Sequence, residues 1–158
     1  MVTAAYAGGQ ASPQGKRLPP APARTAGQQA SRCSGAYSFL REGEVLQLTI
    51  QPGEQAPSTK VTGFISRHGE LESDHGTLLD HWIRNGSLQS SELQFRTATI
   101  HGVWFEFEGS VSNGATPAGE GTGCVIRGKL TEHLLDANHH ERAQWRMVEL
   151  KPLPAPVE

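Results

Sequence analysis

Apolar and polar residues alternate along most of the chain between residues 34 and 151, most clearly over residues 93–111. Successive side chains of a β-strand point to opposite faces, so this alternation predicts two strands, with a reversal at His101-Gly102. In the second strand the expected inward positions are Val103, Phe105, Phe107, Gly109 and Val111, and the expected outward positions are Trp104, Glu106, Glu108 and Ser110. Trp104 is then the one large aromatic residue expected on the polar face.

The same alternation recurs in short segments separated by turn-forming residues, at 37–41, 44–51, 61–66, 77–84, 92–97, 103–111, 122–130 and 144–151. About eight short strands at regular spacing are typical of an all-β fold, and we predict a single antiparallel up-and-down β-barrel. Gly63 predicts a bulge within its strand, and Asn85-Gly86 predicts a hairpin turn. Residues 77–84 could instead form a short helix, and residues 132–142 predict a loop or one helical turn.

The chain divides into three parts by composition. Residues 1–32 are rich in Ala, Gly, Pro, Gln and Ser without apolar periodicity, and predict a disordered tail. Residues 33–152 form the predicted barrel domain, and residues 153–158 a Pro-rich C-terminal tail. Within the first part, Ala5-Tyr6-Ala7 fits the small-x-small pattern that precedes a signal-peptidase cleavage site. The alternatives are a remnant of an export signal and an ordinary Ala-rich tail.

Charge and cysteine content narrow the class of protein. The net charge is −2, so no global positive field favours nucleic acid as a partner. No apolar run reaches the roughly 20 residues of a membrane-spanning helix. Cys33 and Cys124 are either two independent core residues or a disulfide, which requires an oxidising compartment. A disulfide favours a periplasmic or secreted protein, and free thiols favour a cytoplasmic one. The oligomeric state cannot be inferred.

Two resemblances add to this interpretation. Gly35-Ala36-Tyr37 resembles the Gly-x-aromatic opening of lipocalins and avidin-like barrels, which implies a closed barrel with a small ligand inside. The residues that hold biotin in avidins have no counterpart, so biotin binding is not implied. The runs at 41–50, 62–67 and 101–109 are similar to a group of uncharacterised bacterial, acidobacterial-type small β-barrel proteins. That similarity implies a bacterial origin and no particular activity.

The histidines are the main candidates for chemistry. Asp74-His75, Asp80-His81 and His139-His140 combine imidazole with carboxylate or with a second imidazole, as a transition-metal site would. Adjacent residues of a strand point to opposite faces, however, and no His-x-His or His-Glu-x-x-His pattern occurs. No nucleophile motif and no glycine-rich phosphate loop are present. We therefore predict no metal, no cofactor and no catalytic residue.

The predicted topology nevertheless gathers these polar residues. In an up-and-down barrel alternate connections lie at the same end, and binding residues sit disproportionately on loops. The end that carries the first, third, fifth and seventh connections collects the candidate ligand-binding residues His68, Asp74, His75, His101, His133, His139 and His140. We expect a small apolar ligand in the barrel interior, bound with a pH dependence near 6 to 7 because an unperturbed histidine titrates at about 6.5. The alternatives are a hydrolase- or isomerase-type enzyme using Arg67, Asp80 and His81 at the mouth, or an interaction domain with a filled core.

Overall fold

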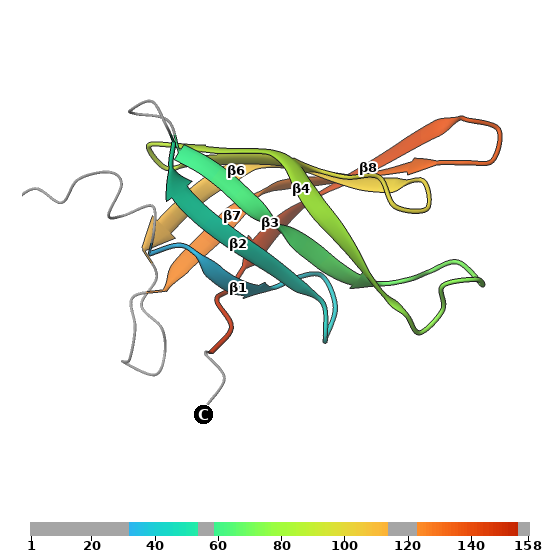
Figure 1. Cartoon of the computed structure of the whole chain (residues 1–158), viewed down its shortest axis with the longest axis horizontal. Helices are drawn as coiled ribbons and strands as arrows, with labels where there is room; N and C mark the ends of the chain where they lie inside the picture. The colour runs from blue at the N-terminus through green and yellow to red at the C-terminus, as the bar shows by residue number, and fades with distance from the viewer. Residues whose placement is uncertain (1–31, 54–58, 114–122, 155–158) are drawn as a thin grey trace, which may run out of the picture.

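A computed structural model describes residues 32–53, 59–113 and 123–154, which form one antiparallel sheet of eight strands (Figure 1). The strands follow one another in sequence order, each hydrogen-bonded to the next. Their bounds are β1 (Gly35–Ser38), β2 (Val45–Pro52), β3 (Thr59–His68), β4 (Leu78–Gln89), β5 (Glu92–Thr97), β6 (Val103–Asn113), β7 (Cys124–Leu135) and β8 (Glu141–Leu150). The all-β, up-and-down prediction is confirmed. Most of the predicted tail 1–32 and the last residues of the C-terminal tail lie outside the described residues.

The sheet curls strongly but does not close, so the predicted barrel is wrong in this respect. β1 has four residues and β8 has ten, so most of β8 extends past any partner that β1 could offer. The two edges meet only just after β8, in an isolated bridge between Tyr37 and Pro152. There the N–H of Ser38 donates to the carbonyl of Lys151 at 2.9 Å, and the N–H of Leu153 donates to that of Ala36 at 2.8 Å. The result is a half-barrel.

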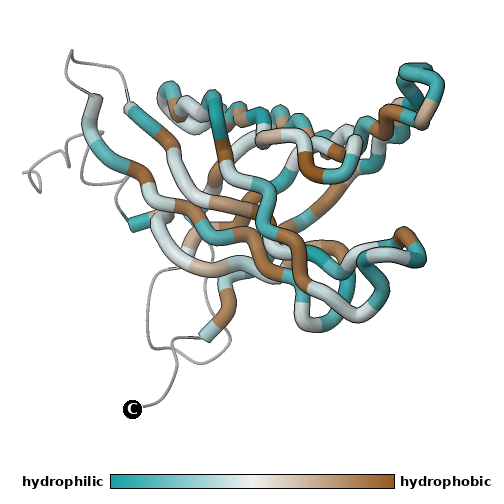
Figure 2. The backbone as a smooth tube through the Cα atoms, turned by 45° about the vertical axis from the view of Figure 1, so that its right-hand side comes forward, coloured by the Kyte–Doolittle hydropathy of each residue, from teal (hydrophilic) through white to brown (hydrophobic). Residues whose placement is uncertain are grey.

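The inner face of the curled sheet holds the hydrophobic core (Figure 2). Phe105 and Phe107 are fully buried, and Phe107 stacks on Phe95 with 5.2 Å between ring centroids. Glu108 is exposed and Glu106 is partly exposed, so the predicted orientation of β6 is confirmed. His101 and Gly102 both have positive φ, 48° and 78°, which confirms the predicted reversal.

Two glycine predictions have opposite outcomes. At Gly63 the β3–β4 register shifts as expected, and an added Cβ would lie 1.9 Å from the carbonyl oxygen of Gln47. Asn85-Gly86 is not a turn: it lies inside β4, at a second register shift. A Cβ at Gly86 would lie 2.5 Å from the carbonyl oxygen of Val61, so this glycine lets β4 approach β3 closely. The chain reverses instead just after β4, where Ser90 has a φ of 56°.

One other expectation is corrected, and one is confirmed. Residues 132–142 are not mainly a loop or helical turn, because β7 continues to Leu135 and β8 begins at Glu141. This long β7–β8 hairpin projects from one end of the molecule, as the β3–β4 hairpin does below it in Figure 1. Residues 78–84 belong to strand β4, as favoured, and not to a helix.

Trp104 lies on the outer face of β6, as predicted, but it is buried there. Only 7% of its surface is accessible, because His133 stacks on its indole at 4.8 Å and Arg96 covers the ring at 5.6 Å. The exposed tryptophans are Trp82 and Trp145, at 53% and 65%. Alternation placed Trp104 on the outer face correctly, but it could not show that neighbouring strands supply a cover for that face.

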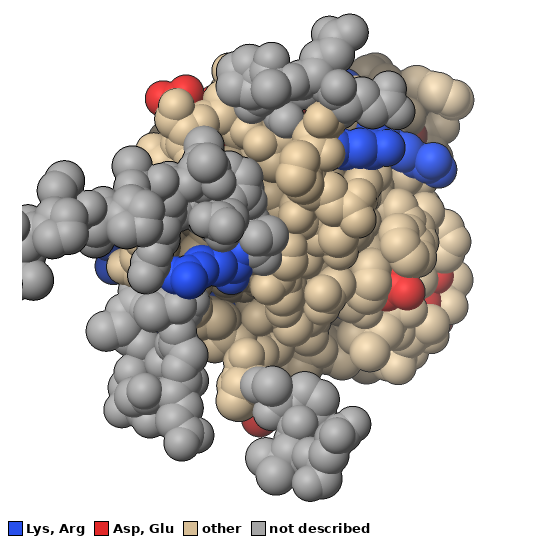
Figure 3. Space-filling view, turned by 60° about the vertical axis from the view of Figure 1, so that its left-hand side comes forward, with Lys and Arg blue, Asp and Glu red and all other residues tan. Residues whose placement is uncertain are grey.

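A disulfide joins Cys33 and Cys124 across 91 residues of sequence. It links the segment before β1 to the first residue of β7, and both cysteines are buried in the core. The Tyr37 hydroxyl donates to the Cys33 carbonyl at 2.7 Å, and burial raises the Tyr37 pKa to about 12. The disulfide therefore holds this end of the half-barrel together covalently. In Figure 3, which turns this end of the molecule forward, few charged side chains are visible on the described surface.

Phe107→Ala should lower the free energy of unfolding by about 3–5 kcal/mol, because it removes a buried ring from the core. Glu106→Gln should change it by less than about 1 kcal/mol, since the exposed ion pair of Glu106 with Arg96 contributes little. Urea unfolding of both variants measures the difference. Equal costs for the two substitutions would contradict the orientation of β6.

Replacing both cysteines by serine should lower the free energy of unfolding by about 2–5 kcal/mol, because a disulfide that closes a long loop restricts the unfolded chain. The control is the wild-type chain unfolded with and without a thiol reductant. Reduction should lower its stability to that of the double variant. Unchanged stability on reduction would show that this link does not hold the two edges together.

Candidate functional site

A cavity of about 470 Å³ opens at the end of the half-barrel opposite the disulfide. Its wall is formed by the β1–β2 turn, the β3–β4 loop and the neighbouring parts of β6, β7 and β8. The apolar lining consists of Phe39, Leu40, Leu71, Val103, Phe105 and Leu134. The remaining lining is polar and contains four arginines and three glutamates. The cavity is therefore amphipathic, and its charges lie toward the inside of the sheet.

Arg67 provides a buried cation in this cavity. The residue is only 6% exposed, because it occupies an inward position near the end of β3. Its Nε donates to Nε2 of His81 at 3.1 Å, and its Nη1 lies 3.4 Å from the carbonyl oxygen of His68. The guanidinium carbon lies 5.7 Å from the centroid of the Phe105 ring, within the range of a cation–π contact. Among the described residues Arg67 forms no ion pair with a carboxylate.

His81 fixes the position of Arg67 and remains neutral. It is fully buried on the inner face of β4, with its ring edge-to-face against Phe105 at 5.2 Å. Burial lowers its pKa to about 4, and the positive charge of Arg67 acts in the same direction. Because Nε2 accepts from Arg67, the ring proton resides on Nδ1. Nδ1 makes no hydrogen bond of good geometry among the described residues, although the nearby backbone of Ala98 and Val103 partly opposes the lowering of the pKa.

Glu44 connects the first two hairpins beneath the cavity. Its carboxylate is almost fully buried, at 5% exposure for the residue. One oxygen accepts from the backbone N–H of Arg41 and the other from that of His68, both at 3.1 Å. Two backbone donors satisfy a carboxylate well in a low-dielectric site. Its negative charge is thus used to hold the β1–β2 turn against the end of β3.

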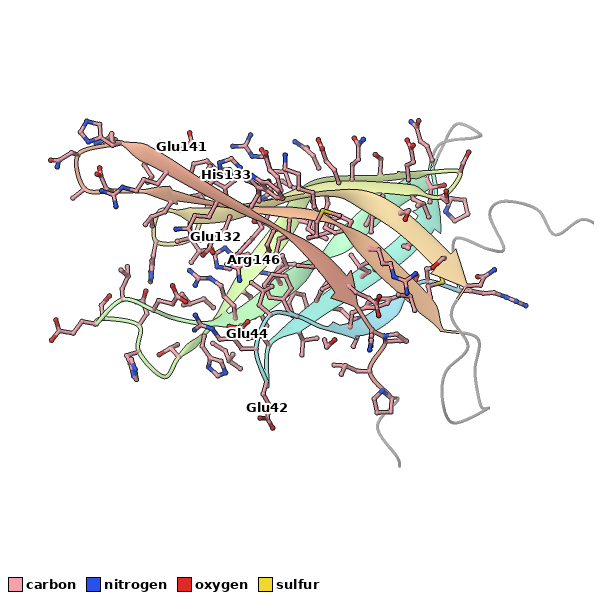
Figure 4. All side chains as sticks on the ribbon, turned by 180° about the vertical axis from the view of Figure 1, so that it is seen from behind. Glu42, Glu44, Glu132, His133, Glu141 and Arg146 are labelled. Atoms are coloured by element: carbon pink, nitrogen blue, oxygen red, sulfur yellow. A yellow bond between two sulfur atoms is a disulfide. The ribbon has the colours of Figure 1, made fainter. Side chains whose placement is uncertain are left out.

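The β7–β8 hairpin forms the opposite wall. Glu132, Arg142, Gln144 and Arg146 occupy its inward positions, and Arg146 lies 3.8 Å from Glu132. Figure 4 shows Glu132 and Arg146 on the side of the hairpin that faces Glu44, whereas Glu141 and His133 lie on its other side. These residues were not among those predicted from the sequence, because residues 132–142 were expected to form a loop or one helical turn, and no inward face was assigned to the strand over residues 144–151.

An ion pair and a side-chain hydrogen bond connect the β3–β4 loop to its neighbours at the rim of the cavity. Arg41 pairs with Glu70, and Nδ1 of His101 lies 2.7 Å from Oδ2 of Asp74. Asp74 is buried, and its pKa is lowered, first by the hydrogen bond with His101. Inside the loop, the N–H of Gly69 donates to the carbonyl of Thr77 at 2.9 Å. The β3–β4 loop is therefore tied to both neighbouring turns.

The structure places the seven predicted ligand-binding residues at the predicted end, but not in one cluster. Asp74 and His101 form the pair described above. The other five are divided among the end of β3, the β3–β4 loop, the outer face of β7 and the β7–β8 turn. None of the seven lines the cavity.

His133 lies on the outer face between two glutamates. Its Nδ1 lies 2.7 Å from Oε1 of Glu141, and its Nε2 lies 3.2 Å from Oε2 of Glu106. His140 lies 3.5 Å from Asp136 in the β7–β8 turn, where His139 has a φ of 62°. His68 ends β3 and gives its N–H to Glu44, and His75 is exposed. Their role in binding a ligand stays a prediction.

The residues of the enzyme alternative separate in a similar way. Arg67 and His81 are in contact, but Asp80 is exposed and lies on the opposite face of β4 from His81. The lone pair of neutral His81 is occupied by the Arg67 N–H, so the ring is poorly placed to take a proton from a substrate. The pair can instead present a fixed positive charge. Within the part of the chain that the structure describes, no three His, Cys, Asp or Glu residues are grouped to hold a metal ion.

No protein-family model matches this sequence, and no curated protein matches it. In the described residues, no helix has the length and apolar character needed to cross a membrane.

His81→Gln should reduce the acid sensitivity of the protein. As pH falls from 6.5 to about 4, the unfolded chain protonates His81 while the folded chain does not, so folding stability falls by up to about 3 kcal/mol. Glutamine keeps an acceptor for Arg67 but does not titrate. Urea unfolding of both proteins across this range measures the difference in slope, since the carboxylates contribute equally to both. Identical slopes would show that His81 is not buried as a neutral ring.

Proposed function

We propose that this protein binds a small organic ligand in the cavity at the open end of the half-barrel. The observation that carries the proposal is one cavity wall that combines aromatic side chains with a buried, unpaired arginine. Its volume of about 470 Å³ lies within the range of about 300–1,000 Å³ typical of small-molecule sites. Such sites are commonly largely apolar with a few fixed polar groups. This cavity is more polar, since eight of its fourteen lining residues are polar or charged, so it suits a ligand that carries a polar or charged group beside its apolar part.

The apolar part of the ligand is assigned to one side of the cavity. Phe39 and Phe105 are buried and meet edge-to-face at 5.6 Å, so they present a rigid aromatic surface at its base. Leu71 and Leu134 lie nearer the entrance and remain 47% and 38% exposed. Burial of these leucines by a ligand would remove apolar surface from water. Core side chains occupy the inner face beyond this point, so the ligand sits at the mouth and does not fill the interior.

The disulfide supports a place of action outside the cytoplasm. Structural disulfides persist in oxidising compartments and are rare in reducing ones. Cys33 and Cys124 are buried, and their bridge links the two edge regions of the sheet. A periplasmic or secreted binding protein of bacterial type is consistent with this link and with the similarity noted in the sequence.

Leu134→Trp should block the cavity, because a larger ring at the entrance occupies the space of the ligand. The probe is N-phenyl-1-naphthylamine, an uncharged dye whose fluorescence rises in apolar surroundings. We expect the dye to bind the wild-type protein and the variant to bind it about tenfold more weakly, as loss of one good apolar contact predicts. A fluorescence titration measures both.

The matched control is Leu153→Trp, since Leu153 is 39% exposed and lies outside the cavity wall. It should bind the dye as the wild-type protein does. No dye binding by the wild-type protein, or equal binding by both variants, would contradict a ligand site at this end.

A further inference from the structure

We propose that the ligand is an organic monocarboxylate with an apolar body, and that Arg67 binds its carboxylate. This inference rests on the proposed function, because it names the class of ligand for the same cavity. It concerns the feature of the site that packing alone leaves unexplained, which is a nearly buried guanidinium without a carboxylate partner among the described residues.

A buried charge is costly unless it is paired and hydrogen-bonded. Arg67 is 6% exposed, yet its two hydrogen bonds go to neutral acceptors, the imidazole of His81 and the carbonyl of His68. Its third nitrogen, Nη2, makes no hydrogen bond within the described part of the chain, and it is not among the fully enclosed unpaired atoms. That nitrogen therefore remains open to the cavity and can donate to an anion.

The carboxylates that line the cavity are engaged elsewhere. Glu44 accepts from two backbone N–H groups, Glu70 pairs with Arg41, and Glu132 lies beside Arg146. None of them forms an ion pair with Arg67. Buried Asp74 also feels the charge of Arg67, but its two oxygens are hydrogen-bonded to Ser73 and His101, and it forms no ion pair with Arg67. Among the described residues no carboxylate is in contact with the guanidinium, which can therefore bind one from outside.

The surroundings hold the guanidinium in place before a ligand arrives. His81 fixes Nε, the ring of Phe105 covers the planar face at 5.7 Å, and both side chains are fully buried. A planar guanidinium with its remaining N–H groups in a fixed fork is suited to a carboxylate. The same Phe105 ring borders the apolar side of the cavity, so the head and the body of one ligand can be bound together.

The charge balance favours a monoanion. Arg67 is the buried cation of the four lining arginines. Arg41 and Arg146 are at least half exposed and already beside glutamates, and Arg142 is exposed on β8. A phosphate dianion would bring two charges next to a single buried guanidinium and close to the buried carboxylate of Glu44. A monocarboxylate brings one charge, which Arg67 can neutralise. Octanoic acid has this chemistry and is a suitable probe.

The experiment is calorimetric titration of the full chain with octanoate, octanol and octyl phosphate. Octanoate should bind about tenfold or more tightly than octanol, because a hydrogen bond to a charged group is stronger than one to a neutral group. It should also bind more tightly than octyl phosphate. Arg67→Met should reduce octanoate binding to the level of octanol and leave octanol binding unchanged. Arg127→Met, on the outer face of β7, should keep the preference.

The outcomes separate this inference from the proposed function. Equal binding of octanoate and octanol, or tighter binding of octyl phosphate, overturns the monocarboxylate assignment and leaves a ligand site in place. No binding of any of the three overturns both. If Arg67→Met does not fold, the Nε–H resonance of Arg67 in the wild-type protein decides the matter. It should shift with octanoate and not with octanol, and a resonance that octanoate leaves unmoved overturns the role of Arg67.

Discussion

The structure depends on the curl of one sheet, since its inner face is buried only if the sheet bends back over itself. Close approach of neighbouring strands allows that bend. Gly109 and Gly128 are paired between β6 and β7, and a Cβ at either would lie within 3 Å of the Phe107 ring. The Phe107 ring therefore packs directly on the backbone of Gly109 and Gly128, where a side chain would leave no room for it. Gly63 permits a similar approach of β3 to β2, and Gly86 permits one of β4 to β3, each close to a register shift.

The two ends of this curled sheet differ because the strands differ in length. At one end the disulfide and the Tyr37–Pro152 bridge hold the edges together. At the other end β7 and β8 continue beyond the core, while β1 has already ended. The inward positions of these extended strands cannot be covered by the opposite edge. The cavity is the space that results, and charged residues can line it because water reaches them.

Arg67 and His81 lie where the core and the cavity meet. Phe105 contacts both side chains, so the core itself orients the buried guanidinium of Arg67 and the buried imidazole of His81. Hydrogen bonds hold the surrounding loops in place. Glu44 accepts from two backbone N–H groups, and Asp74 is hydrogen-bonded to His101. A ligand of the proposed kind would require little reorganisation of this region on binding, which would favour its affinity.

The amino-acid pattern determined the elements of this fold, because strand alternation is a local property. It predicted the β5–β6 hairpin, the inward positions of Phe105 and Phe107 and the bulge at Gly63, all of which the structure bears out. Only the tertiary structure decided which polar face points inward. On β8, Arg142, Gln144 and Arg146 face the cavity, whereas Trp145 and Met147 face solvent. Alternation shows that two sets of side chains point to opposite faces, but it does not show which set points inward. Where a strand extends beyond the hydrophobic core, the polar set can point inward and the apolar set outward. The tertiary structure also decided that the sheet does not close into a barrel, since closure requires the edge strands β1 and β8 to match in length.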